Sequence, residues 1–293
     1  MMTKRIEGVL TAIVTTFDDY GDFCPKRMRK QVQRQLNNGN SIFCNGTNGE
    51  FFVLTSKEKM AVTETCVDEV AGKAPIMAHI GEISTRETIK LGKEIQKLGV
   101  DAVSVIAPYF IPLKQDELIY HYTKIADSLT VPVFLYNIPA RTGNTIMPET
   151  AAKLGEHPNI LGIKDSAGSY ESLKGFLDVA NNMDGFDVLT GPDSLIYQGF
   201  VDGCVGSISG LANVAPDKIN AIWKHYKAGN LEQSKAAQDA VGELRKNLYA
   251  TVFSPAAVKK ALSIMGQEVG VSRYPIEFST KDLADIKNIV SKL

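Results

Sequence analysis

The segment VPVFLYNIPARTGNTIMPETAAKLGEHPNILGIKDSAG, residues 131–168, contains one complete repeat of the pattern that decides the fold. An apolar run of strand length, 131–139, is followed by an amphipathic stretch of helical period, 147–157, and by a second apolar run, 160–168. Both apolar runs are almost continuously hydrophobic, which is typical of parallel strands covered by helices. The segment therefore predicts a strand–helix–strand unit of a parallel sheet.

The same alternation extends over most of the chain. Eight apolar runs have strand length, at residues 8–17, 41–46, 75–81, 101–108, 131–139, 160–168, 186–193 and 204–214. Amphipathic helical stretches follow many of them, at residues 25–39, 57–72, 84–99, 114–129 and 147–157. Eight such repeats over roughly 225 residues predict a (β/α)8 TIM barrel, a fold of about 250 residues. A doubly wound open sheet is the alternative, which the lack of a G-x-G-x-x-G pattern after the first run disfavours.

The strand pattern stops near residue 228, and the remaining apolar residues recur with helical period. No flexible or low-complexity linker separates this part from the rest of the chain. We therefore predict a barrel over residues 1–228 and a C-terminal helical extension over residues 229–293 that packs on it.

The composition excludes several classes of protein. Lys and Arg number 32 against 33 Asp and Glu, so no general attraction to nucleic acid or to anionic membranes is expected. No apolar run approaches the roughly 20 residues of a membrane helix, and the N-terminal sequence reads as a first strand rather than a signal peptide. The four cysteines form no C-x-x-C pair, which indicates free thiols and a cytoplasmic protein. They are Cys24, Cys44, Cys66 and Cys204.

The sequence CNGTNGEF, residues 44–51, ends the second predicted strand, and active residues of a TIM barrel lie at such strand ends. Gly46 and Gly49 allow sharp turns, so backbone N–H groups and the Thr47 hydroxyl could hold an anion there. An ordinary glycine–asparagine turn is the alternative interpretation.

Lys164 stands in an otherwise apolar run and has two possible orientations. It could point outward beneath a helix and pair with a carboxylate, or point into the barrel. Gly162 and Ser166 share its face and would leave room for a ligand, which favours the second orientation. A buried neutral amine can attack a carbonyl carbon, and Tyr136, on the adjacent predicted strand, could transfer the protons.

Other strand ends carry further candidates. Arg141 could hold a carboxylate bidentately or be a surface residue. Asp193 and Ser194 could contact substrate hydroxyls, and the small residues of GSISG, 206–210, would leave space for a ligand. No lysine or arginine accompanies these last two stretches, so a phosphate site is not favoured, and the four scattered histidines do not indicate a metal site.

Four motifs occur in order at predicted strand ends: GTNGE (46–50), YNIPARTG (136–143), GIKD (162–165) and GPD (191–193). Together they resemble those of the dihydrodipicolinate synthase / N-acetylneuraminate lyase family of class I aldolases, and the resemblance covers the whole chain. It implies a (β/α)8 barrel, a homotetramer and pyruvate bound as a Schiff base. It also implies that no metal or organic cofactor is needed, because the substrate forms a covalent imine with Lys164.

The resemblance also implies roles for individual residues. Lys164 matches the imine lysine, and Tyr136 matches the tyrosine that relays protons. Gly46 and Thr47 match the start of the motif that binds the pyruvate carboxylate, with Thr47 also assisting proton transfer. Asn48 replaces a second hydroxyl residue of that motif.

Additional positions concern the substrate. Ile208 matches a position whose backbone lies near pyruvate, and Gly191, Asp193 and Ser194 are expected to contact substrate. Arg141 resembles the synthase arginine that holds the carboxylate of aspartate semialdehyde.

Two departures bear on the member of the family. Phe110 stands where synthases usually have a tyrosine that reaches the neighbouring subunit, and Ile83 replaces an asparagine typical of lysine feedback. The synthase, which condenses pyruvate with aspartate semialdehyde, is the nearest match by motif. An aldolase or dehydratase of 2-keto-3-deoxy sugar acids and an N-acetylneuraminate lyase stay open. So does a non-catalytic keto-acid sensor, which the presence of Lys164 and Tyr136 disfavours.

Overall fold

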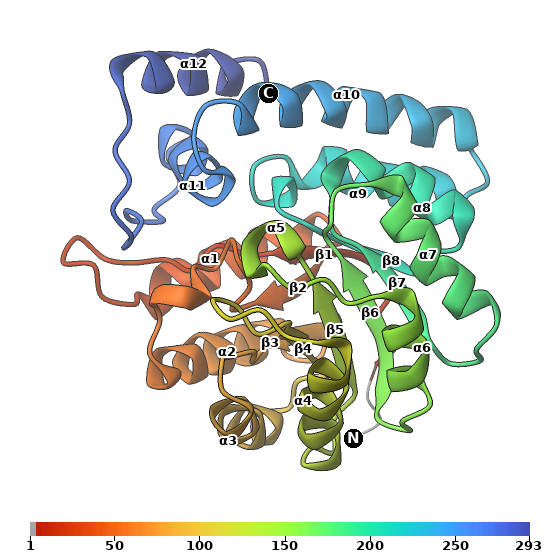
Figure 1. Cartoon of the computed structure of the whole chain (residues 1–293). Helices are drawn as coiled ribbons and strands as arrows, with labels where there is room; N and C mark the ends of the chain where they lie inside the picture. Colours follow the sequence, from red (N-terminus) through yellow and green to blue (C-terminus); the bar gives the residue numbers. More distant parts are fainter. Residues whose placement is uncertain (1–3) are drawn as a thin grey trace. The chain divides into compact units, whose positions relative to one another are not determined.

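In a computed structural model, which describes residues 4–293, eight parallel strands form a closed barrel in chain order (Figure 1). The strands are β1 (Gly8–Ala12), β2 (Ser41–Cys44), β3 (Ile76–His79), β4 (Ala102–Ile106), β5 (Val133–Asn137), β6 (Ile160–Asp165), β7 (Asp187–Thr190) and β8 (Gly206–Ser209). Nearly all strand residues are buried, which explains their almost continuous hydrophobicity. The predicted TIM barrel is confirmed, and the open-sheet alternative is wrong.

Helices alternate with the strands and continue after the last one. The α-helices of the described residues are α1 (Pro25–Asn37), α2 (Ser56–Val70), α3 (Thr85–Ile95), α4 (Gln115–Asp127), α5 (Pro139–Thr142), α6 (Pro148–Gly155), α7 (Tyr170–Asn181), α8 (Ile196–Asp202), α9 (Pro216–Lys227), α10 (Leu231–Tyr249), α11 (Ser254–Ile264) and α12 (Thr280–Val290). Short 3-10 helices are η1 (Phe51–Val53), η2 (Gln96–Leu98), η3 (Asp193–Leu195) and η4 (Leu211–Asn213). Within residues 4–293, no helix has both the length and the apolar character that crossing a membrane requires.

The chain comprises two compact units. One joins the described residues up to Gly8 to Pro75–Ile208 and contains β3 to β7, most of β8 and helices α3 to α8. The other joins Val9–Ala74 to Ser209–Leu293 and contains β2, most of β1, and helices α1, α2 and α9 to α12. In this second unit α10 packs along α9, and α12 contacts both α10 and α11 (Figure 1). A separate C-terminal extension beginning at residue 229 stays a prediction.

Local sequence signals set the ends of several helices. Thr55 and Glu58 form a capping box at the start of α2, in which the Glu58 N–H donates to Thr55 Oγ1 at 3.2 Å and Glu58 Oε2 accepts from the Thr55 N–H at 2.9 Å. At α3 the Ser84 side chain accepts from the Glu87 N–H, a contact typical of an S-x-x-E sequence at a helix start. Gly99, with φ 93°, ends the η2 turn that follows α3.

Several strands end earlier than their apolar runs predict, and the functional loops begin at these points. β2 stops at Cys44 because Asn45 takes a left-handed conformation with φ 57°. β8 stops at Ser209, after which the chain turns into η4 although the apolar run continues to residue 214. Burial alone therefore does not distinguish a strand from the buried loop that follows it.

We expect His121, on α4, to weaken the fold in acid. The imidazole is buried and hydrogen-bonded through Nδ1 to Thr85 Oγ1 at 2.8 Å, and burial lowers its pKa from 6.5 to about 4. The unfolded chain therefore binds a proton that the folded chain does not, so the free energy of unfolding falls as the pH falls from about 6.5 to about 4, by at most about 3 kcal/mol. Urea unfolding at several pH values should show that His121→Gln loses less free energy of unfolding between pH 6.5 and pH 4 than the parent protein does. An equal loss would contradict this role of His121.

Candidate functional site

Tyr136 and Lys164 lie side by side on neighbouring strands. They are direct partners in the register of β5 and β6, so their side chains share one face of the sheet. Lys164 Nζ lies 3.8 Å from the centroid of the Tyr136 ring, and the lysine is only 5% exposed. The expected meeting of these two side chains is present. A buried amine beside a phenol combines a nucleophile with a proton carrier.

His79 of β3 packs against Tyr136. Its ring meets the Tyr136 ring edge to face, with centroids 5.8 Å apart and an interplanar angle of 87°. His79 Nδ1 lies 3.0 Å from the Ser104 carbonyl oxygen, a hydrogen bond that fixes the imidazole and so limits where the tyrosine ring can move. The sequence shows His79 inside a strand but gives no sign of this contact.

Gly162 and Ser166 lie at close contacts between neighbouring strands. A Cβ on Gly162 would lie 2.1 Å from the Asp187 carbonyl oxygen of β7, and a Cβ on Gly191 would lie 1.9 Å from Ser166 Oγ. The small residues thus allow the backbones and side chains of adjacent strands to approach closely. The room for a ligand beside Lys164 that these residues are expected to leave stays a prediction.

Asp165 fixes the loops that follow β5 and β6. Its Oδ1 accepts hydrogen bonds from Asn137 Nδ2 at 2.8 Å and from the Ala167 N–H at 3.2 Å. Asn137 Oδ1 in turn accepts from the Ile146 N–H at 3.1 Å. Burial raises the pKa of Asp165, while the hydrogen bonds from Asn137 and Ala167 oppose that rise. Sequence reasoning missed both residues, although each directly follows a candidate catalytic residue.

Two loops with predicted substrate contacts are joined by Asn144. Its Nδ2 donates to the carbonyl oxygens of Pro108, at 2.7 Å, and Ile111, at 2.8 Å. Between these residues Phe110 is 92% exposed and takes a left-handed conformation with φ 81°. Arg141 is exposed on α5, a few residues before Asn144. The side chains of Phe110 and Arg141 are therefore presented to solvent by two segments, the one after β4 and the one after β5, which Asn144 joins.

The candidates after β7 and in β8 differ in accessibility. The Gly191 N–H donates to the Asp165 carbonyl oxygen at 2.7 Å, which ties this strand end to β6. Asp193 is buried in η3, whereas Ser194 beside it is exposed. Ile208 is buried within β8.

The turn at Gly46, Thr47 and Asn48 belongs to the second unit. The left-handed residues that bend it are Asn45, with φ 57°, and Glu50, with φ 59°. The Glu50 N–H donates to the Thr47 carbonyl oxygen at 3.1 Å. A Cβ on Gly46 would lie 2.4 Å from the Phe43 ring, so glycine is needed there for space rather than for an unusual dihedral angle.

Asn48 occupies part of the space that the GSISG stretch was expected to leave open. A Cβ on Gly210 would lie 2.9 Å from both Asn48 Nδ2 and the Tyr249 hydroxyl oxygen. Gly210 therefore makes room for these two side chains of its own unit. In residues 4–293, no group of three or more His, Cys, Asp and Glu side chains could hold a metal ion.

Comparison with known proteins agrees with this arrangement. The model of the dihydrodipicolinate synthetase family matches residues 5–293. The chain is 34% identical over 288 residues to 4-hydroxy-tetrahydrodipicolinate synthase of Methanopyrus kandleri, covering 97% of this chain and 95% of that protein. A DapA-like lyase of Halobacterium salinarum is 34% identical over 272 residues, covering 92% and 88% of the two chains.

A solved structure extends the likeness to three dimensions. The crystal structure of the chloride-inhibited dihydrodipicolinate synthase of Acinetobacter baumannii complexed with pyruvate has a TM-score of 0.93, at 32% identity and with 98% of each chain covered. The family match, the sequence identity and the shared fold agree over nearly the whole chain. The protein therefore belongs to the dihydrodipicolinate synthetase family of class I, pyruvate-dependent lyases.

Proposed function

We propose that the protein forms or cleaves a carbon–carbon bond next to pyruvate through a Schiff base on Lys164. The observation that carries this proposal is the buried contact of 3.8 Å between Lys164 Nζ and the Tyr136 ring. Nζ attacks the keto carbon of pyruvate, and the resulting carbinolamine loses water to give a protonated imine. Loss of a methyl proton gives an enamine, whose carbon adds to an aldehyde, and water then releases the product.

We assign the proton transfers of these steps to Tyr136, with Thr47 assisting. The pyruvate carboxylate is assigned to Thr47, Gly46 and Asn48, on the match of GTNGE to the family motif. Backbone N–H groups and hydroxyls at a sharp turn are suitable donors to a carboxylate. Ile208, Gly191, Asp193 and Ser194 are proposed as further substrate contacts. The four free thiols support a cytoplasmic location, and the family membership supports a homotetramer.

The nearest specific activity is the condensation of pyruvate with aspartate semialdehyde, as in 4-hydroxy-tetrahydrodipicolinate synthase. Arg141 supports it because an exposed guanidinium can bind the second carboxylate with two hydrogen bonds. A second candidate is an aldolase, dehydratase or N-acetylneuraminate lyase acting on a sugar acid. The exposed Phe110 favours this candidate because it lacks the hydroxyl of the synthase tyrosine.

A panel of substrates distinguishes these activities. Purified protein is assayed for condensation with aspartate semialdehyde, and for pyruvate release from sialic acid, 2-keto-3-deoxy sugar acids and 4-hydroxy-2-oxoglutarate. We expect aspartate semialdehyde to give the highest kcat/KM. Preference for a sugar acid would replace the synthase assignment with the second candidate. Pyruvate binding without turnover on any member would indicate a sensor.

Replacing Arg141 with leucine tests the assignment of its guanidinium. We expect the KM for the second substrate to rise about ten- to hundredfold, since a hydrogen bond to a charged group contributes about 1.5–3 kcal/mol. The KM for pyruvate should change little. Arg86→Leu, which removes another exposed arginine from α3, is the matched control. An unchanged KM for the second substrate would show that Arg141 does not bind it.

A further inference from the structure

A buried ion pair involves Glu50, which ends the turn that carries Thr47. Glu50 is 1% exposed and Lys259 of α11 is 2% exposed, and Lys259 Nζ donates to Glu50 Oε1 at 2.7 Å. The other oxygen, Oε2, accepts from the Arg273 N–H at 3.0 Å. Both carboxylate oxygens are thus held by residues more than 200 positions later in the chain, within the same compact unit.

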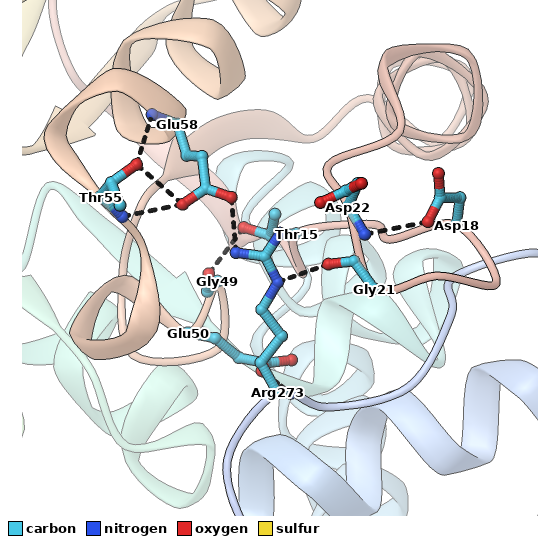
Figure 2. Close-up of polar contacts among 9 residues, drawn as sticks. All are labelled: Thr15, Asp18, Gly21, Asp22, Gly49, Glu50, Thr55, Glu58 and Arg273. Carbon is cyan, nitrogen blue, oxygen red and sulfur yellow. Dashed lines mark hydrogen bonds and ion pairs between the residues drawn. The ribbon is translucent and has the colours of Figure 1, made fainter.

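The Arg273 side chain extends this network to two more segments. Its Nε donates to the Gly21 carbonyl oxygen and its guanidinium donates to Glu58 Oε1, both at 2.6 Å (Figure 2). Glu58 belongs to the capping box of α2, and its pKa is lowered because the hydrogen bonds from Thr55 and Arg273 outweigh the effect of burial. The guanidinium also lies 4.2 Å from the centroid of the Phe17 ring. Arg273 therefore joins the segment after α11 to the loop that contains Gly21 and to the first turn of α2.

Stability alone does not account for this buried pair. Removing a lysine from water is costly, and burial lowers the pKa of Lys259 to about 8 even though Glu50 opposes that change. Buried ion pairs often contribute less to stability than apolar residues of the same volume would. What such a pair does provide is a fixed position for the carboxylate, and through it for the backbone of Glu50.

The backbone of Glu50 is the part of the turn that most needs such an anchor. Glu50 is a non-glycine residue with φ 59°, a conformation that costs of order 1 kcal/mol or more. Its N–H donates to the Thr47 carbonyl oxygen at 3.1 Å. Figure 2 shows a second contact, in which Thr15 Oγ1 donates to the Gly49 carbonyl oxygen at 2.6 Å. Residues 47–50 are therefore held by a backbone hydrogen bond within the turn and by side chains from other segments, rather than by a sheet or a long helix.

We infer that Glu50 is a positioning residue, which Lys259 and Arg273 hold so that the turn at Gly46–Asn48 keeps its donors in place for the pyruvate carboxylate. This inference rests on the proposed function of that turn. Donors that are fixed before the ligand arrives bind an anion more tightly, because no reorganisation is needed on binding. The C-terminal segment thus contributes to pyruvate binding without contacting pyruvate.

The test compares the KM for pyruvate with kcat in two variants. Glu50→Gln keeps the shape and removes the charge, and Glu50→Gln combined with Lys259→Met removes both charges, so that no unpaired ammonium is left buried. We expect both variants to raise the KM for pyruvate about tenfold while kcat falls less than threefold. Glu268→Gln, which breaks an exposed ion pair with Lys30 in the same unit, is the matched control and should leave the KM unchanged.

The double variant keeps the inference testable if Glu50→Gln alone fails to fold. A double variant that folds and binds pyruvate like the parent protein would overturn the inference and make the pair purely structural. A melting temperature that falls while the KM stays within twofold would overturn it as well. Reduction of the parent protein with borohydride in the presence of pyruvate distinguishes a failure of this inference from a failure of the proposed function. If the parent is not labelled, the proposed function fails. If it is labelled and the variants have the same KM for pyruvate as the parent, only this inference fails.

Discussion

Lys164→Ala is expected to reduce turnover by roughly 10⁴-fold or more, because it removes the amine that forms the imine. No neighbouring group can replace a covalent electron sink. The alanine variant should still fold, since the substitution leaves the backbone of β6 and its pairing with β5 and β7 in place. Steady-state assays with the preferred substrate, together with circular dichroism, measure both effects.

Two further variants make the result specific. Lys164→Arg keeps a long side chain beside Tyr136 but supplies a guanidinium in place of the nucleophilic amine, so it should be as inactive as the alanine variant. Lys153→Ala removes an exposed lysine that pairs with Glu156 on α6, and it should retain normal turnover. Turnover of Lys164→Ala within a hundredfold of the parent protein would contradict the proposed mechanism.

Tyr136→Phe is expected to lower kcat by about 10²–10³-fold, the usual contribution of a positioned general acid–base group. Phenylalanine keeps the ring that Lys164 Nζ and the edge of His79 contact, so only the hydroxyl is lost. Because the nucleophile is retained, the variant should still form an imine that borohydride can reduce, although more slowly. Stopped-flow and steady-state kinetics measure the two rates.

Tyr122→Phe is the matched control for this loss of a hydroxyl. The Tyr122 hydroxyl, on α4, is buried and donates to the Val105 carbonyl oxygen at 3.2 Å. Its removal should cost about 1 kcal/mol of stability and leave kcat nearly unchanged. A kcat for Tyr136→Phe within threefold of the parent would assign proton transfer to another group.

The barrel was predictable because its signal is repeated. Each parallel strand is buried on both faces and each helix on one, so the sequence alternates between two recognisable periods. The neighbourhood of Tyr136 and Lys164 followed from the same regularity, since consecutive strands of a barrel pair and their ends meet at one rim. The structure bears this out in the register of β5 and β6.

Other features depend on contacts that no local pattern records. The ion pair between Glu50 and Lys259 joins residues 209 positions apart. Gly162, whose small size suggests open space in the sequence, is closely packed against β7. The edge-to-face contact of His79 with Tyr136 joins β3 to β5, and only the three-dimensional arrangement reveals it.

The choice of substrate is harder to predict for a different reason. Arg141, on the short helix α5, and Phe110, on a loop, are exposed at positions where little packing constrains the residue type. Asn144, the buried residue that joins the two loops, has no property in the sequence that distinguishes it from an ordinary turn asparagine. The reaction class therefore follows from buried strand ends, whereas the substrate depends on exposed loops.

The most direct test of the Schiff-base mechanism is reduction of the protein with sodium borohydride in the presence of pyruvate, followed by peptide mass mapping. We expect one pyruvate-derived modification per chain, on the peptide that contains Lys164, together with loss of activity. Protein treated with borohydride alone should stay active and unmodified. An active protein that is not labelled, or that is labelled only at another lysine, would contradict the assignment of Lys164.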